Sequence, residues 1–181
     1  MSRQRNQGDF WDAVHLGNVK DVIKIAKLGV DLDNTSRGAS AVYVASQQGD
    51  VTMIDTLSKL GADVNLPAGD GTTPIGAAVH GDRVDAVKAL VKQGGDVNIP
   101  NNAGATPMYM AAQNGYVKSI TTLGKLGADV HIASAEGVTP IYIATLQNQV
   151  DAITLLAKLG GVLCVMDVLL CMRRLVVVVA M

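Results

Sequence analysis

Apolar and polar positions recur along this chain with a period of 33 residues. Leucine shows the period most simply, at Leu57, Leu90, Leu123 and Leu156. Two sets of glycines keep the same interval, namely Gly61, Gly94, Gly127 and Gly160, and then Gly38, Gly71, Gly104 and Gly137. Such self-similarity predicts a solenoid, in which each repeat contacts only its neighbours and the stacked repeats share one core.

Each period predicts two short helices separated by a turn. In the copy at 104–131, Thr106-Pro107 opens the first helix, because Thr caps backbone N–H groups and Pro fits the first helical position. Gly115 ends this helix. The second helix carries one apolar stripe, which in the four regular copies is Val51, Ile54 and Leu57; Val84, Val87 and Leu90; Val117, Ile120 and Leu123; and Val150, Ile153 and Leu156.

Several segments of this period resemble the ankyrin repeat. They are Thr-Pro-Ile at 73–75, Thr-Pro-Met-Tyr-Met-Ala-Ala at 106–112, Thr-Pro-Ile-Tyr-Ile-Ala at 139–144 and Gly-Ala-Asp-Val-Asn at 61–65. The resemblance covers about residues 8–161. It implies an all-α solenoid of five helix-turn-helix repeats, each preceded by a β-turn or hairpin finger, and it implies a non-enzymatic module that binds another protein.

The chain is expected to divide into a polar segment, five repeats and an apolar tail. The predicted boundaries are 1–7 for the segment, 8–33, 34–66, 67–99, 100–132 and 133–161 for the repeats, and 162–181 for the tail. The first repeat departs from the family, with Gly8-Asp9-Phe10-Trp11 in place of Thr-Pro-Leu-His. Because a terminal repeat has one face in water, we expect Phe10 and Trp11 to cover the N-terminal edge of the core. The alternative is that they anchor a partner.

Two positions inside the repeats also depart from the family. Its His is replaced in successive repeats by Tyr43, Gly76, Tyr109 and Tyr142. Asp82 and Asn148 hold the place of the glycine that ends the first helix. Because Asp and Asn tolerate the left-handed backbone conformation best among non-glycine residues, both turns are expected to form. The third repeat, where Gly81 comes one position early, is expected to have the least regular turn.

The resemblance places the recognition surface on the concave side, formed by the finger tips and the exposed face of each first helix. Carried over position by position, it predicts partner contacts at Arg37, Asp70, Thr72 and Glu136 on the fingers and at Gln47, Gln48, His80, Gln113, Asn114, Leu146 and Gln147 on the helices. The amides among them can hydrogen-bond an extended peptide or a loop, and simple solvation is the alternative for each. Since this face has no acidic or basic stripe, we do not expect strongly salt-dependent association.

Composition and histidine placement disfavour other functions. The 181 residues carry 15 basic and 16 acidic side chains, a net charge of -1, and 3% aromatic residues, which gives no reason to expect nucleic-acid binding. His15, His80 and His131 lie in different repeats, without a nucleophile or a ligand set at a suitable spacing. We therefore expect no catalytic residue, no metal and no cofactor.

One modification follows from the resemblance. Asn65 and Asn98 each follow Asp-Val and lie eight residues after a leucine, a pattern similar to that of ankyrin substrates of an asparaginyl hydroxylase. Possible hydroxylation at these two residues stands against the alternative that both asparagines only hydrogen-bond within the turn.

The tail at 162–181 breaks the repeat, and 17 of its 20 residues are apolar. Three interpretations remain open: a cap over the fifth repeat, a membrane anchor, or a misread gene end that is not a selected protein sequence. Asp167, Arg173 and Arg174 oppose insertion, at about 3 kcal/mol each near the bilayer centre. The polar N-terminus has no apolar stretch typical of a signal peptide.

The favoured function is thus a monomeric, cytoplasmic module that binds a partner protein or peptide on its concave face, with a nuclear location left open. The alternative is a membrane-tethered ankyrin adaptor anchored by the tail.

Overall fold

The computed structural model describes residues 2–35 and 38–161. These residues form ten helices and no strand. In consecutive pairs, the helices are α1 (Ser2–His15) and α2 (Val19–Ala26), α3 (Ala41–Gln48) and α4 (Val51–Lys59), α5 (Pro74–His80) and α6 (Val84–Lys92), α7 (Pro107–Asn114) and α8 (Val117–Lys125), and α9 (Pro140–Leu146) and α10 (Val150–Lys158). The prediction of an all-α solenoid of five repeats is confirmed.

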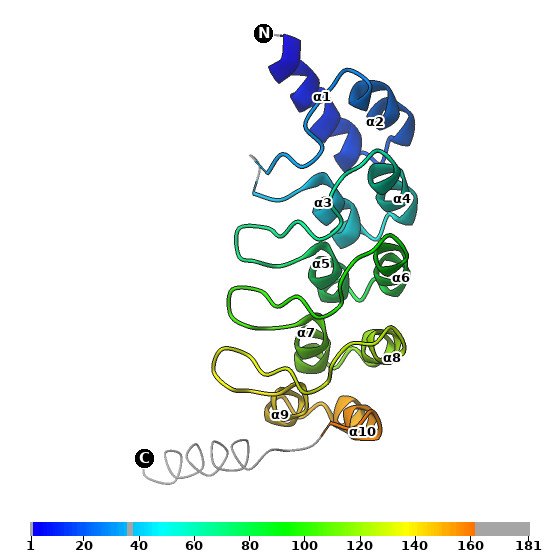
Figure 1. Ribbon diagram of the computed structural model, residues 1–181. Coiled ribbons are helices and arrows are strands. Elements are labelled where there is room, and N and C mark those ends of the chain that lie inside the picture. Colours follow the sequence, from blue (N-terminus) through cyan, green and yellow to red (C-terminus); the bar gives the residue numbers. More distant parts are fainter. Residues whose placement is uncertain (1, 36–37, 162–181) are drawn as a thin grey trace.

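The helix pairs stack in two layers, with the loops between repeats projecting from one side (Figure 1). The first helices form one layer, in which α3 packs on α5, α5 on α7 and α7 on α9. The second helices form the other layer, in which α4, α6, α8 and α10 pack in order. Each projecting loop, called a finger below, joins a second helix to the first helix of the next repeat. The molecule therefore exposes an edge of fingers beside a layer of first helices.

Side-chain caps start the first helices of repeats two to five. The cap hydroxyl accepts a hydrogen bond of 3.2–3.4 Å from the backbone N–H three residues later. These caps are Ser40, Thr73, Thr106 and Thr139. In the last three, Pro follows at the first helical position, where it needs no hydrogen-bond partner for its nitrogen. The predicted Thr-Pro helix start is confirmed.

The core lies between the two helix layers and contains most of the predicted second-helix stripe. Fully buried members are Ile54, Leu57, Val87, Leu90, Ile120, Leu123 and Leu156. Val51, which begins the first stripe, is partly buried and packs against this core. The stripe was wrong at Val117 and Val150, which are 38% and 64% exposed. Both are the first residue of their helix, and a helical side chain leans toward the N-terminus. Their side chains therefore lean out past the end of the core.

The N-terminal repeat closes one end of the core with its two large aromatic side chains. Phe10 and Trp11 are 0% and 2% exposed, with their ring centroids 6.4 Å apart, so the predicted covering role is confirmed. Helix α1 begins at Ser2, which places most of the polar segment 1–7 in this helix. The Gln7 amide is held by Asp31, donating to its carbonyl at 2.8 Å and accepting from its N–H at 3.1 Å.

Turns with a hairpin-like hydrogen bond form the fingers of repeats three to five. In the third repeat, the Gly71 N–H donates to the Ala68 carbonyl at 2.9 Å, and the Ala68 N–H donates to the Thr72 carbonyl at 2.9 Å. The two later fingers repeat both bonds. Adjacent fingers are joined by one backbone bond each, from the Asn102 N–H to Asp70 and from the Ala135 N–H to Ala103, both 3.0 Å. The fingers thus form a connected edge.

Candidate functional site

A groove of about 580 Å³ runs between the fingers and the first helices, from repeat two to repeat five. The exposed sides of α3, α5 and α7 form one wall, and the fingers of repeats three to five form the other. Six of the predicted contact residues line it: Gln47, Asp70, Thr72, His80, Gln113 and Glu136. The structure thus brings together side chains that are up to 89 positions apart in the sequence, from Gln47 to Glu136.

The remaining predicted contact residues lie elsewhere. Gln48 faces the first repeat, where its Nε2 donates to the His15 carbonyl at 3.4 Å. Asn114 donates to the Met110 carbonyl of its own helix at 2.9 Å. Leu146 and Gln147, at the end of α9, are not among the residues that line the groove. Arg37 lies outside the described residues.

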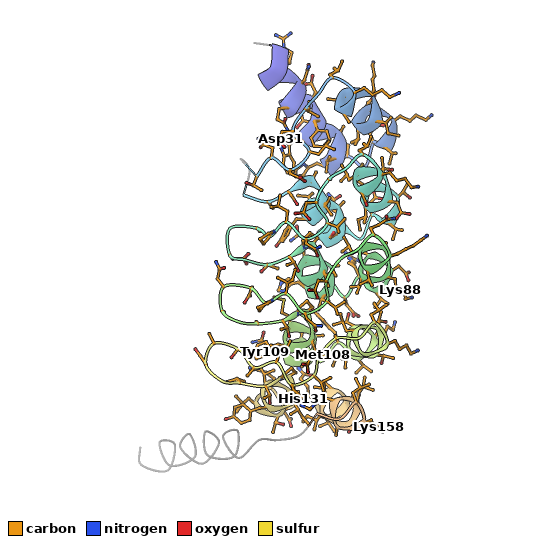
Figure 2. The ribbon with its side chains drawn as sticks, viewed as in Figure 1. Asp31, Lys88, Met108, Tyr109, His131 and Lys158 are labelled. Atoms are coloured by element: carbon orange, nitrogen blue, oxygen red, sulfur yellow. The ribbon has the colours of Figure 1, made fainter. Side chains whose placement is uncertain are left out.

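Two tyrosines that were not among the predicted contacts also line the groove. Tyr43 on α3 and Tyr109 on α7 occupy equivalent positions two repeats apart and are half-buried. Figure 2 shows Tyr109 on the finger side of the first-helix layer, whereas Lys88 and Lys158 project from the second helices. The sequence already showed that tyrosine recurs at the same position of the 33-residue repeat. The resemblance to the ankyrin family assigned that position a structural role, so these tyrosines were not predicted as partner contacts.

Asp70 is held in the groove wall by Thr72. The carboxylate accepts the Thr72 N–H at 2.9 Å and the Thr72 hydroxyl at 2.8 Å. These two hydrogen bonds lower the pKa of Asp70 below its ordinary value, against a small opposing effect of burial. Thr72 itself is 7% exposed, so its part in the groove is to fix a charged neighbour that faces solvent.

Each tyrosine lines the groove together with a carboxylate on the finger of the following repeat, and the charge of that carboxylate affects the pKa of the tyrosine. Burial is the larger cause that raises the pKa of Tyr43, and the negative charge of Asp70 adds to it. The pKa of Tyr109 is raised in the same way, by burial and then by Glu136. The groove therefore contains two tyrosine–carboxylate pairs, Tyr43 with Asp70 and Tyr109 with Glu136.

The repeat between these pairs carries neither the tyrosine nor the carboxylate. Gly76 stands in the register of the tyrosines and Ala103 in the register of the finger carboxylates. A Cβ on Gly76 would lie 2.9 Å from Cγ2 of Thr72 and 3.6 Å from Met110. The backbone of α5 thus approaches Thr72 too closely for a side chain, and the middle of the groove is lined by small residues such as Ala77 and Ala105.

The groove carries a local negative charge that the near-neutral chain does not reveal. Asp70 and Glu136 line it, whereas among the residues that the structure describes no lysine or arginine does. The two carboxylates lie on separate fingers with Ala103 between their positions, so they are single charges and the expectation of a face without an acidic stripe is not contradicted. Folding concentrates two carboxylates there because the finger positions of repeats three and five fall on one wall.

A second depression, of about 640 Å³, lies on another side of the array, beside the starts of α6 and α8. Its lining mixes charges of both signs, including Arg83, Asp85 and Lys118. The side chain of Arg83 covers Gly49, coming within 3.0 Å of the position that a Cβ there would take. The side chain of Arg83 thus packs against the preceding repeat.

The asparagines proposed for hydroxylation link adjacent repeats. Asn65 accepts the Asp96 N–H at 2.9 Å and donates to the Gly94 carbonyl at 3.2 Å. Asn98 accepts the Asp129 N–H at 2.8 Å. Both side chains are partly buried, and their hydrogen bonds reach the next repeat, whereas the alternative to hydroxylation expected bonds within the turn. Hydroxylation remains a prediction.

Within residues 2–35 and 38–161, no group of three or more His, Cys, Asp or Glu side chains is arranged to hold a metal ion. The same part of the chain contains no helix with the length and apolar character needed to cross a membrane. The membrane anchor that the sequence left open falls on 162–181, outside the described residues.

Comparison with known proteins agrees with the repeat architecture. A family model described as ankyrin repeats in three copies matches residues 42–134. The chain is also similar to the mouse inactive serine/threonine-protein kinase TEX14, with 41% identity over 63 residues. That match covers 34% of this chain and 4% of the mouse protein.

Proposed function

Because the chain belongs to the ankyrin-repeat family, whose arrays are in general protein–protein interaction modules, we propose that it binds a partner protein or peptide in the groove between fingers and first helices. The observation that carries the proposal is that six residues predicted from sequence register line one continuous groove. Binding requires no catalytic step, and the family is typically non-enzymatic.

The groove suits a polypeptide for two reasons. Gln47 and Gln113 are exposed in it, and their amides can donate to and accept from a peptide main chain. Its walls are held by capped helices and by hydrogen-bonded fingers before any partner arrives, which limits the ordering cost of association. A partner segment therefore meets a preformed surface.

A matched test is available, because two of the five predicted amides line the groove and the other three do not. The full chain carrying Gln47→Arg and Gln113→Arg is compared with one carrying Gln48→Arg and Asn114→Arg. Both variants gain the same charge and lose the same kind of side chain. Proteins captured by the parent and identified by mass spectrometry are expected to be lost from the first variant and retained by the second.

If both variants lost the captured proteins equally, the partner would bind outside the groove, or the added positive charge alone would explain the loss. Circular dichroism spectra and thermal midpoints check that both variants fold like the parent.

The proposed location is the cytoplasm. The repeats contain no cysteine, and two cysteines seven residues apart, Cys164 and Cys171, are too few to predict a disulfide framework, which favours a reducing compartment.

A further inference from the structure

The groove contains the same pair of groups twice, in the same register. Tyr43 and Asp70 line the groove together, and Tyr109 and Glu136 do so two repeats further along. Between them, Gly76 and Ala103 occupy the corresponding positions. Ring and carboxylate are thus present together or absent together in three consecutive registers.

We propose that the groove binds an extended segment of a partner protein that carries two basic side chains, one at each tyrosine–carboxylate pair. This inference rests on the proposed function of the groove and specifies the chemistry of the partner.

The charge of the groove selects for a cation. Glu136 is exposed and has no side-chain hydrogen bond or ion pair within the described part of the chain, and the exposed Asp70 carboxylate accepts two hydrogen bonds from Thr72. Among residues 2–35 and 38–161, no lysine or arginine lines the groove to neutralise either carboxylate. An arginine or lysine of a partner would supply the missing counter-charge, and a guanidinium can bond a carboxylate through two N–H groups.

The tyrosines give each pair a second way to hold a cation. Both rings are half-buried, and Tyr109 packs against the core, which restricts its orientation before a ligand arrives. A cation over an aromatic face is attracted by the negative charge of that face. Ring and carboxylate together favour arginine, whose planar group stacks on the ring while its edge reaches the carboxylate.

The spacing of the pairs sets the spacing of the basic residues. Packed helices lie about 8–10 Å apart, so positions two repeats apart are separated by about 16–20 Å. An extended chain rises about 3.3 Å per residue, so the two basic residues of the partner should be about five or six positions apart. The open middle of the groove, lined by Ala77, Ala103 and Ala105, leaves room for the intervening backbone.

A phage-displayed library of random linear peptides, selected on the full chain, tests the proposal directly. The enriched sequences are expected to share two basic residues about five or six positions apart. Synthetic peptides from the selection are then measured by fluorescence polarisation. Their affinity is expected to fall as sodium chloride is raised, because exposed ion pairs are screened.

Matched charge variants locate the contact. Asp70→Asn with Glu136→Gln removes the two groove carboxylates, and Asp85→Asn with Asp151→Asn removes two exposed carboxylates on second helices. Both variants change the net charge by the same amount. The first is expected to weaken peptide binding by about 10-fold or more, as two partly exposed ion pairs would, and the second by less than about 2-fold.

The other outcomes separate this inference from the proposed function. Enriched peptides without basic residues that still lose affinity with Gln47→Arg and Gln113→Arg would overturn the cationic partner and keep the groove as the binding site. Enriched peptides insensitive to every groove substitution would contradict both proposals, as would a library from which nothing is enriched. If the two carboxylate variants weakened peptide binding equally, the change in net charge would explain the effect, and the inference would be overturned.

Discussion

Asp82, in the turn between α5 and α6, accepts a 2.6 Å hydrogen bond from the hydroxyl of Ser119 in the next repeat. Asp82 has a φ of 51°, in the left-handed region where other repeats use glycine. Ser119 is fully buried on α8. A residue that departs from the repeat pattern therefore gains a contact that glycine could not make.

The hydrogen bond, more than the backbone conformation, is expected to decide the effect of substitution at Asp82. Asp82→Gly removes the acceptor from a buried hydroxyl and is expected to lower the free energy of unfolding by about 1–2 kcal/mol. Asn148→Gly makes the same change at a φ of 56°, where no side-chain hydrogen bond holds the exposed Asn148 within the described residues. It is expected to change that free energy by less than about 0.5 kcal/mol. Urea unfolding measures both.

A double-mutant cycle with Ser119→Ala supplies the control. If Asp82→Gly costs as much in the Ser119→Ala background as in the parent, the two side chains are not coupled. That result would contradict the assignment.

The repeat period made the fold predictable, because one capped helix pair recurs with little variation. Asp82 and Asn148 were expected to adopt the left-handed conformation, and they do. The hydrogen-bond partner of Asp82 could not be read from the sequence, since Ser119 lies 37 residues away and other repeats have Met53, Ala86 or Ala152 in its register. Val117 and Val150 were misassigned because periodicity marks the face of a helix but not where the core ends along it.

The candidate site was predictable in register but not in extent. Gln47 and Gln48 are adjacent, yet one lines the groove and the other faces the first repeat. The pairing of Tyr43 with Asp70 crosses a repeat boundary, and a position-by-position reading of single repeats cannot detect it. Local motifs thus locate the surface, whereas contacts between repeats define its chemistry.

The two asparagines that link repeats are expected to differ in their contribution to stability. Asn65→Ala breaks two hydrogen bonds, to Asp96 and Gly94, and is expected to lower the free energy of unfolding by about 1–2 kcal/mol. Asn98→Ala breaks one, to Asp129, and is expected to cost about half as much. Equilibrium denaturation checks the order, and a larger loss for Asn98→Ala would contradict it.

The tyrosines of the groove are expected to titrate at high pH in a way that depends on their carboxylates. Burial and then Asp70 raise the pKa of Tyr43 above the ordinary 10.0. The folded chain thus holds this proton more tightly, so the stability it contributes is present below pH 10 and is lost as pH rises through the folded pKa. Asp70→Asn is expected to lower the pKa of Tyr43 part of the way, since burial remains.

Spectrophotometric titration of tyrosinate absorbance measures this shift. Asp85→Asn, which removes a carboxylate outside the groove, is the control and is expected to leave the curve unchanged. An identical curve for Asp70→Asn and the parent would show that Asp70 does not act on Tyr43.

Gly104 and Gly137 have the same backbone conformation, but contact between fingers is expected to make alanine more destabilising at Gly104 than at Gly137. Gly104 and Gly137 have φ values of 73° and 76°, so alanine is strained by about 1 kcal/mol at either position. Among residues 2–35 and 38–161, a Cβ on Gly137 would meet nothing within 4 Å, whereas one on Gly104 would press on the backbone nitrogen of Ala135. Gly104→Ala is therefore expected to cost about 1–3 kcal/mol more than Gly137→Ala.

Amide hydrogen exchange identifies the cause of that difference. The Ala135 N–H donates the 3.0 Å bond to Ala103 that joins the last two fingers. Gly104→Ala is expected to push this N–H away and to speed its exchange, while Gly137→Ala leaves it protected. Because Glu136 follows Ala135 on the same finger, the substitution would also shift one carboxylate of the groove. If the Ala135 N–H stayed protected from exchange in the Gly104→Ala variant, the hydrogen bond between the two fingers would be intact, and the proposed cause of the destabilisation would be contradicted.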